Sequence, residues 1–290
     1  MLKKTLVGLF AIGIMLGCLV ETGMAAEKFI IACDISWAPF EWVAKGTSEQ
    51  IGFDLDVMRS IAILEGVEIE IRDTAFDSII PGIKLGQFDI GASGISITEE
   101  RDKVVDFSPP YWRTEQAIVV RGDSNLNIVT ALAAFGPTKK VATHRGTTGD
   151  KWVEENLVKK GVPIEIARYE TDPEAALAVR TKRADACIQG QTGAKQTIAA
   201  YPELKIVGTV DTGEVGFGFV VQEGDPKKIL PKLASGIRKM KALGAWDNLI
   251  RAYFGPELKD IEEARKECVS KLGARDVGGF AACLAEKTNK

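Results

Sequence analysis

One short stretch of the chain combines small residues with a hydroxyl group and an arginine. It runs from Gly91 to Arg101 with the sequence GASGISITEER, so that Ser96 stands two residues after Gly94 and Arg101 follows five residues later. Small residues let a ligand approach the backbone, and the planar arginine fork matches a carboxylate with two parallel hydrogen bonds. The spacing indicates a site for a small carboxylate. An ordinary helix start, capped by Ser96 or Thr98, is the alternative.

The sequence offers little for catalysis or for nucleic-acid binding. Its only histidine is His144, so a Cys/His metal site and a Ser-His-Asp arrangement are both missing, as is a glycine-rich phosphate loop. We therefore expect no catalytic residue, no metal and no cofactor. The net charge of −3 supplies no basic stripe that could displace counterions, and we expect no nucleic-acid partner.

The first residues indicate export. Two lysines precede an apolar run over 6–20, and small residues follow at 22–26. This order is typical of a secretory signal peptide, here 1–26, with cleavage after residue 25 or 26. No other apolar run approaches the ~18 residues of a spanning helix. We expect a periplasmic protein, with lipid anchoring through Cys18 as the alternative.

The remaining cysteines fall into two groups. Cys33 and Cys187 lie in apolar, strand-like segments and resemble small buried hydrophobic residues. Cys268 and Cys283 lie in a polar, helix-rich tail, where an oxidising compartment would favour a disulfide between them. Sequence alone does not fix that connectivity.

Strand-like and helix-like segments alternate in two separate stretches, which predicts two α/β units with mostly parallel sheets. The predicted strands are 28–33, 67–71, 89–92, 140–143, 164–169 and 184–188, and the predicted helices are 53–64, 76–85, 150–159, 173–181, 229–243 and 246–254. Two β-like segments, 116–120 and 216–221, are predicted to cross between the units. The tail 257–290 is predicted to be an added helical hairpin.

Seven segments resemble, in order and at matching spacing, the periplasmic amino-acid-binding proteins of ABC importers. This is the family-3 solute-binding group, which includes the glutamine- and the lysine/arginine/ornithine-binding proteins. The segments are 34–42 (DISWAPFEW), 52–56 (GFDLD), 76–83 (FDSIIPGI), 91–101, 106–112 (DFSPPYW), 183–186 (RADA) and 246–250 (WDNLI). The resemblance covers about residues 28–256.

The resemblance implies the type II periplasmic-binding-protein fold, in which two α/β lobes on a two-stranded hinge close on a solute. On this expectation, 27–114 and 218–256 form lobe 1 and 115–217 forms lobe 2. The C-terminal helical extension 257–290 lies outside the resemblance.

The resemblance also implies ligand-binding roles. It places Arg101 on the ligand carboxylate, with the Gly94 carbonyl and the Ser96 hydroxyl and amide beside it. Thr148 matches a helix N-terminus where free amides favour the other carboxylate oxygen. The further candidates are Asp34, which would recognise the ligand side chain, the aromatic residues Trp37, Phe76 and Trp112, and, in lobe 2, His144 and Gln189. Core packing of the aromatic residues and a solvated loop position for Asp34 are the alternatives.

One departure limits the prediction of the ligand. Family members that bind free α-amino acids usually carry an aspartate for the α-ammonium at the position that Gly190 occupies here. Asp185 is five residues too early and is expected to be structural. Because a buried ammonium without an anion is costly, Asp34, Glu214 or a neighbour supplies the charge, or the ligand lacks a normal α-ammonium, as in a cyclised or N-substituted amino acid.

The resulting hypothesis is a monomeric solute-binding receptor of an ABC import system. It would bind a polar amino acid or a similar small carboxylate between its lobes and deliver it to a permease in the inner membrane. Two alternatives are an enzyme that resembles cyclohexadienyl dehydratase on the same scaffold, which needs a pocket acid, and a sensory module that presents the solute to a receptor.

Overall fold

The computed structural model describes residues 26–126, 139–255, 258–273 and 275–289. The predicted signal peptide up to residue 25, and with it Cys18, lies outside these residues. Within the described part of the chain, no helix is long and apolar enough to cross a membrane.

The first half of the molecule is built on a five-stranded sheet in the order β4-β1-β5-β12-β6. Strands β1, β4 and β5 are parallel, whereas β12 runs antiparallel to β5 and β6. The strands are β1 (Lys28–Cys33), β4 (Glu68–Asp73), β5 (Ile90–Gly91), β6 (Val105–Phe107) and β12 (Val220–Gln222), with a separate hairpin of β2 (Trp42–Val43) and β3 (Gln50–Ile51).

Helices cover this first sheet. Helix α1 has acidic residues in its first turn and ends at Gly66 in the left-handed conformation (φ 67°), both of which favour a helix at these positions. The helices of this half are α1 (Phe53–Glu65), α2 (Phe76–Lys84), α3 (Glu99–Asp102), α8 (Ile229–Ala242) and α9 (Ala245–Tyr253).

The second half is a five-stranded sheet in the order β11-β7-β10-β8-β9. Strands β8, β9 and β10 are parallel, and β7 runs antiparallel to β10 and β11. Its elements are β7 (Gln116–Arg121), β8 (Lys139–His144), β9 (Ile164–Tyr169), β10 (Ala186–Gly190), β11 (Leu204–Val210), α5 (Thr148–Val153), α6 (Asp172–Arg180) and α7 (Gln191–Ala200).

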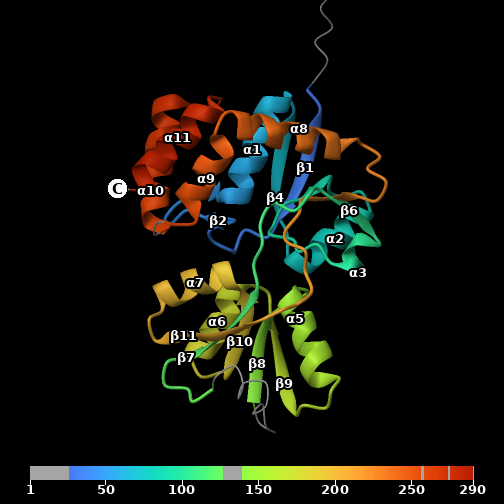
Figure 1. Cartoon of the computed structure of the whole chain (residues 1–290), viewed down its shortest axis with the longest axis vertical. Coiled ribbons are helices and arrows are strands. Elements are labelled where there is room, and N and C mark those ends of the chain that lie inside the picture. The colour runs from blue at the N-terminus through green and yellow to red at the C-terminus, as the bar shows by residue number, and fades with distance from the viewer. Residues whose placement is uncertain (1–25, 127–138, 256–257, 274, 290) are drawn as a thin grey trace, which may run out of the picture.

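Two passages of the chain join the halves, one before β7 and one before β12 (Figure 1). The predicted crossing segments themselves are largely strands within the sheets, 116–120 in the second and part of 216–221 in the first. The predicted helix 150–159 begins two residues earlier, at Thr148, and continues as a π-helix over Glu154–Val158. The structure is therefore α/β, with two sheets that contain parallel strands and are flanked by helices.

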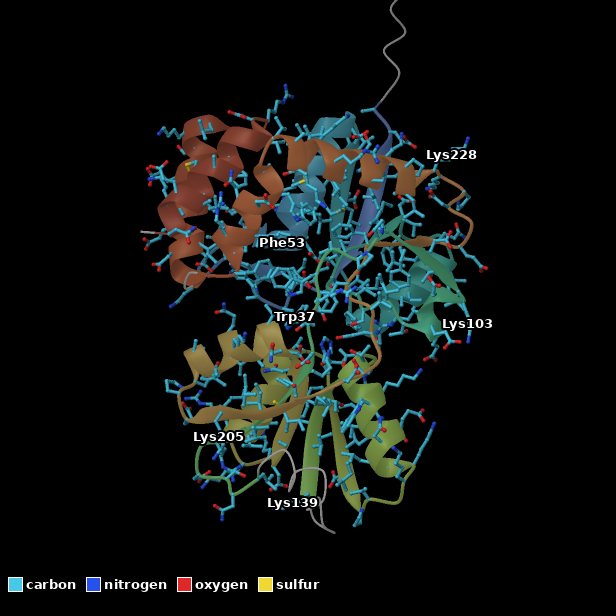
Figure 2. All side chains as sticks on the ribbon, viewed as in Figure 1. Trp37, Phe53, Lys103, Lys139, Lys205 and Lys228 are labelled. Atoms are coloured by element: carbon cyan, nitrogen blue, oxygen red, sulfur yellow. A yellow bond between two sulfur atoms is a disulfide. The ribbon has the colours of Figure 1, made fainter. Side chains whose placement is uncertain are left out.

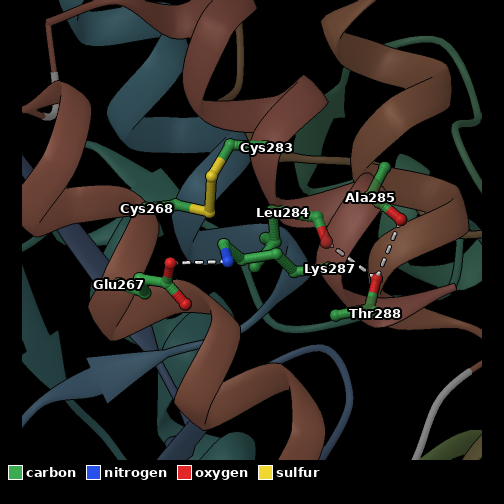
Figure 3. Close-up of a disulfide and its surroundings, with 7 residues drawn as sticks. All are labelled: Glu267, Cys268, Cys283, Leu284, Ala285, Lys287 and Thr288. Carbon is green, nitrogen blue, oxygen red and sulfur yellow. Dashed lines mark hydrogen bonds and ion pairs between the residues drawn. A yellow bond between two sulfur atoms is a disulfide. The ribbon is translucent and has the colours of Figure 1, made fainter. Parts of the chain in front are cut away.

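The tail forms two further helices that pack on the first half. Helices α10 (Leu258–Leu272) and α11 (Val277–Thr288) are joined by a disulfide between Cys268 and Cys283, whose Cα atoms are 5.9 Å apart (Figure 3). Cys33 and Cys187 are free and buried. The inner faces of α10 and α11 belong to the same hydrophobic core as α1 and α9, so the tail is part of this half and not a separate appendage.

Candidate functional site

A cavity lies between the two halves and is lined by residues of both. Figure 2 shows Trp37 in the space between them. Two of the ten predicted ligand-binding residues, Arg101 and Trp112, do not line the cavity. The eight that line it are Asp34, Trp37, Phe76, Gly94, Ser96, Thr148, His144 and Gln189.

Arg101 lies at the edge of this cavity, in α3. The motif does begin a helix, because the Thr98 hydroxyl caps α3 by accepting from the Arg101 amide, while the arginine side chain turns toward the other half. Its Nη1 donates to the Ser96 carbonyl at 2.9 Å, and its Nη2 donates to the Gly146 carbonyl at 3.0 Å. Arg101 and Thr148 line a second, open cleft that adjoins the cavity. The guanidinium therefore spans the two halves beside Thr148.

The guanidinium of Arg101 has an electrostatic setting suited to an anion. Burial lowers its pKa to about 10, and the Glu214 carboxylate partly opposes this shift. Its carbon Cζ lies 5.5 Å from the centre of the Phe76 ring, within the range of a cation–π contact. A buried cation of this kind is stabilised by an anionic ligand.

Thr148 is the first residue of α5 and lies directly after the capping residue. The Thr147 hydroxyl accepts from the Asp150 amide, and the first amides of a helix have no acceptor within the helix itself. The Thr148 hydroxyl accepts from Gln116 Nε2 at 3.1 Å and donates to Glu214 Oε2 at 3.1 Å. The side chain of Thr148 is thus engaged, and its amide is the group suited to a carboxylate.

Trp37 packs across the boundary between the halves. One face stacks on Phe40, with ring centres 4.6 Å apart. Elsewhere it meets three glycines: an added Cβ would lie 2.2 Å from the ring at Gly94, 2.8 Å at Gly190 and 2.2 Å at Gly193. Contacts below 3.0 Å are essentially never seen, so these positions admit only glycine in this arrangement.

Trp112 lies away from the cavity lining. It stacks on Phe254 with ring centres 4.0 Å apart, and its Nε1 donates to Thr192 Oγ1 at 3.2 Å. Trp112 therefore takes the core-packing alternative in the first half and reaches α7 of the second half through one hydrogen bond.

Three carboxylates line the cavity, and two of them face the only histidine. Asp34 Oδ2 lies 3.2 Å from His144 Nε2, and Asp172 Oδ1 lies 3.9 Å from His144 Nδ1. The pKa of His144 is raised: burial lowers it, but the carboxylates of Asp34, Asp172 and Asp77 outweigh that effect. Burial raises the pKa of Asp172 to about 6, against the opposing field of His144.

The third carboxylate belongs to Glu41, which the sequence motifs did not single out. Glu41 is fully buried, and Ser93 Oγ donates to its Oε1 at 2.9 Å. Burial and the neighbouring Asp54 raise its pKa well above the ordinary range. Burial likewise raises the pKa of Asp54 to about 7, although Tyr111 and the Gly94 amide both donate to it. The sequence did carry a signal for Glu41 and Asp54, since each stands among apolar and aromatic residues in a segment on which the family resemblance rests (34–42 and 52–56).

Several acceptor atoms of this cavity have no hydrogen-bond partner among the described residues. These buried, unpartnered acceptors are Glu41 Oε2, Asp172 Oδ1 and Gln189 Oε1. The amide nitrogen of Gln189, Nε2, donates to Thr197 Oγ1. Asp185, by contrast, accepts from the Lys140 amide at 2.9 Å and does not line the cavity. Buried acceptors require donors, so the cavity suits a ligand that carries several of them.

Two α/β halves with a polar cavity between them define a two-lobed solute-binding protein. Residues 29–256 match the family described as bacterial extracellular solute-binding proteins, family 3. The chain belongs to this family.

Similar proteins include named amino-acid binders. A probable histidine-binding protein of Campylobacter jejuni is 32% identical over 75% of this chain and 81% of its own length. The L-arginine-binding protein of Pseudomonas aeruginosa is 26% identical over 88% of this chain and 97% of its own.

A solved structure of an ancestral arginine-binding protein bound to arginine gives a TM-score of 0.71 at 30% identity, covering 79% of this chain and 98% of the other. The family and these relatives are binding proteins and not enzymes, and the present chain is likewise a binding protein.

Proposed function

We propose that this chain binds an amino-acid-like solute that carries a carboxylate and a cationic group, and that it serves an ABC importer. The observation that carries the proposal is the division of one interlobe site into two poles. Arg101 and the start of α5 form a pole for an anion, while Asp34, Glu41 and Asp172 form a pole of acids.

The balance of charge favours a cationic solute over a neutral one. Asp34 and Asp172 face only one imidazole, so the three acids that line the cavity outnumber the one imidazole that lines it. A guanidinium, ammonium or imidazolium group would supply donors to the unpaired acceptors of the cavity. Hydrogen bonds to charged groups contribute about 1.5–3 kcal/mol each.

The relatives support a periplasmic location and delivery to a permease. The histidine-binding periplasmic protein of Salmonella typhimurium is 26% identical over 79% of this chain and 88% of its own length. The ABC transporter arginine-binding protein 1 of Escherichia coli is 24% identical over 79% of this chain and 92% of its own. We propose the same location and partner for this chain, with a monomer as the working form.

The proposal is tested by a thermal-shift screen with L-arginine, L-lysine, L-histidine, L-glutamine, L-glutamate and cyclic or N-substituted amino acids. A ligand that binds the folded state raises the melting temperature, and the largest shifts are expected from cationic members. Arg101→Ala should weaken binding of the same ligand by roughly tenfold to more than a hundredfold, because a charged hydrogen bond of about 1.5–3 kcal/mol is lost.

Lys84→Ala is the matched control. Lys84 is exposed at the end of α2 and lines neither the cavity nor the adjoining cleft, so its removal should leave the shift unchanged. A protein whose melting temperature responds to none of these ligands, or an Arg101→Ala variant that responds like the wild type, contradicts the proposal.

A further inference from the structure

The position where an aspartate would bind the ligand α-ammonium is closed in this chain. A Cβ atom at Gly190 would lie 2.8 Å from Trp37 Cζ2, so even the first carbon of an aspartate has no room. Trp37 is itself held by stacking on Phe40 and by an edge contact with Phe217. The anion for the ammonium must therefore come from elsewhere in the site.

The three acids that line the cavity lie apart from the carboxylate pole. Asp34 lies at ion-pair distance from His144, and Asp172 faces the other nitrogen of the same imidazole. Glu41 accepts from Ser93 Oγ. These groups suit the distal part of a ligand, but none of them contacts Arg101 or Thr148 among the contacts of the described residues.

Glu214 is the acid that lies beside the carboxylate pole. It precedes β12 on the return passage between the lobes. Its Oε2 accepts from Thr148 Oγ1 at 3.1 Å, and its charge acts on the Arg101 guanidinium. Its other oxygen, Oε1, is buried and has no hydrogen-bond partner among the described residues. A buried carboxylate oxygen without a donor is costly.

We propose that Glu214 replaces the missing aspartate as the anionic partner of the ligand α-ammonium. This inference rests on the proposed function. One carbon separates the α-carboxylate from the α-ammonium, so the acid that receives the ammonium must lie next to the groups that bind the carboxylate. Glu214 meets that condition through its contact with Thr148.

The same placement makes Glu214 a specificity-determining residue. A ligand that lacks the ammonium would bring its carboxylate next to Glu214 without a cation to offset the Glu214 charge, and neighbouring like charges repel. A zwitterionic α-amino acid satisfies both groups. Glu214 therefore selects against des-amino and N-acylated analogues.

The test is a calorimetric titration with matched probes. L-Arginine is compared with Nα-acetyl-L-arginine and 5-guanidinopentanoate, and L-histidine with Nα-acetyl-L-histidine and 3-(imidazol-4-yl)propionate. The wild type should prefer the free amino acid of at least one set by tenfold or more. Glu214→Gln, which keeps the shape of the side chain, should weaken the free amino acid at least tenfold and leave its des-amino analogue unchanged or tighter. Glu223→Gln, an exposed acid beyond β12, is the control.

The outcomes separate the two claims. If Glu214→Gln keeps the wild-type preference, or if the wild type binds the des-amino analogue as tightly as the free amino acid, the role of Glu214 is wrong while the binding function stands. If Arg101→Ala binds as tightly as the wild type, the proposed function itself is wrong. Binding of no probe in either set overturns both. Retained binding of the des-amino analogue by Glu214→Gln shows that the variant is folded.

Discussion

His144 gathers carboxylates from three elements around one imidazole. Asp34 follows β1, Asp77 lies in α2 and Asp172 begins α6, and all three raise the His144 pKa above its ordinary value of 6.5. The ring centre of Phe76 lies 5.5 Å from that of His144. The protonated imidazole is thus the form that this arrangement stabilises.

This setting predicts a pH dependence that NMR can follow at the single histidine, His144. Because the folded-state pKa is raised, His144 contributes stability that is fully present below the unfolded value near 6.5 and is lost as pH rises through the folded pKa. As the chain has a single histidine, the imidazole proton signals in NMR titrate without overlap, and their midpoint should lie above 6.5. Asp172→Asn should lower that midpoint, whereas Asp185→Asn should not. A wild-type midpoint at or below 6.5 contradicts the assignment.

The α10–α11 hairpin is an element that the family match does not include, yet it is tied to the wall of the site. Arg265 donates to both oxygens of Asp56 in α1, at 2.9 and 3.0 Å, and also to Glu49. Glu262 accepts from Trp42 Nε1 at 2.8 Å, next to Glu41 of the cavity. The hairpin therefore holds the β2–β3 segment and the start of α1.

Removal of Arg265 should be strongly destabilising. Asp56 is buried, and Arg265 keeps its pKa low despite burial. Arg265→Met leaves this charge without its main partner, which typically costs about 3–5 kcal/mol. Lys266→Ala, an exposed neighbour on the same helix, should change the free energy of unfolding by less than about 0.5 kcal/mol. Urea denaturation of both variants checks this, and equal stability of the two would refute the role of Arg265.

The elements were predictable to different degrees. The spacing of apolar residues located the ends of β1, α1, β8 and β9 to within one residue, since those patterns extend over a whole strand or several helical turns. The two-residue strands β2 and β3 carry no such period. The packing of the tail depends on ion pairs such as Arg265–Asp56, which join residues 209 apart in sequence, and no local pattern reveals them.

At the scale of the whole molecule, contacts between the lobes hold a closed arrangement. Arg101 reaches the Gly146 carbonyl, Lys151 pairs with Glu100, and Trp37 packs on Gly193. Each contact joins segments that lie in different sheets or flank them, so we expect a ligand bound between the lobes to favour this closed arrangement.

A side chain at Gly193 should therefore obstruct closure. Its Cβ would lie 2.2 Å from Trp37 Nε1, and Gly193→Val should abolish most of the decrease in radius of gyration that a ligand causes in small-angle X-ray scattering. The affinity should fall at least tenfold. Ala200→Val, at the exposed far end of the same helix α7, should behave like the wild type. Normal compaction of Gly193→Val on ligand binding would show that the packing of Trp37 against Gly193 is not needed for closure.

The part of the candidate site that a local motif defines could be predicted from the sequence. The part that consists of buried acids from distant segments could not. The spacing of Gly94, Ser96 and Arg101 is a local pattern, and it predicts the carboxylate pole from the sequence alone. Glu41, Asp54 and Asp172 came to light only in the fold, because their significance comes from burial and from neighbours distant in sequence.

The proposed function requires one interlobe site that binds a small cationic amino acid through Arg101. Isothermal titration of the purified protein with L-arginine and L-histidine, in the wild type and in Arg101→Ala, tests it most directly. We expect saturable one-to-one binding of at least one of them, weakened tenfold or more in the variant while Lys84→Ala matches the wild type. Absence of binding to both, or equal affinity in wild type and Arg101→Ala, would contradict it.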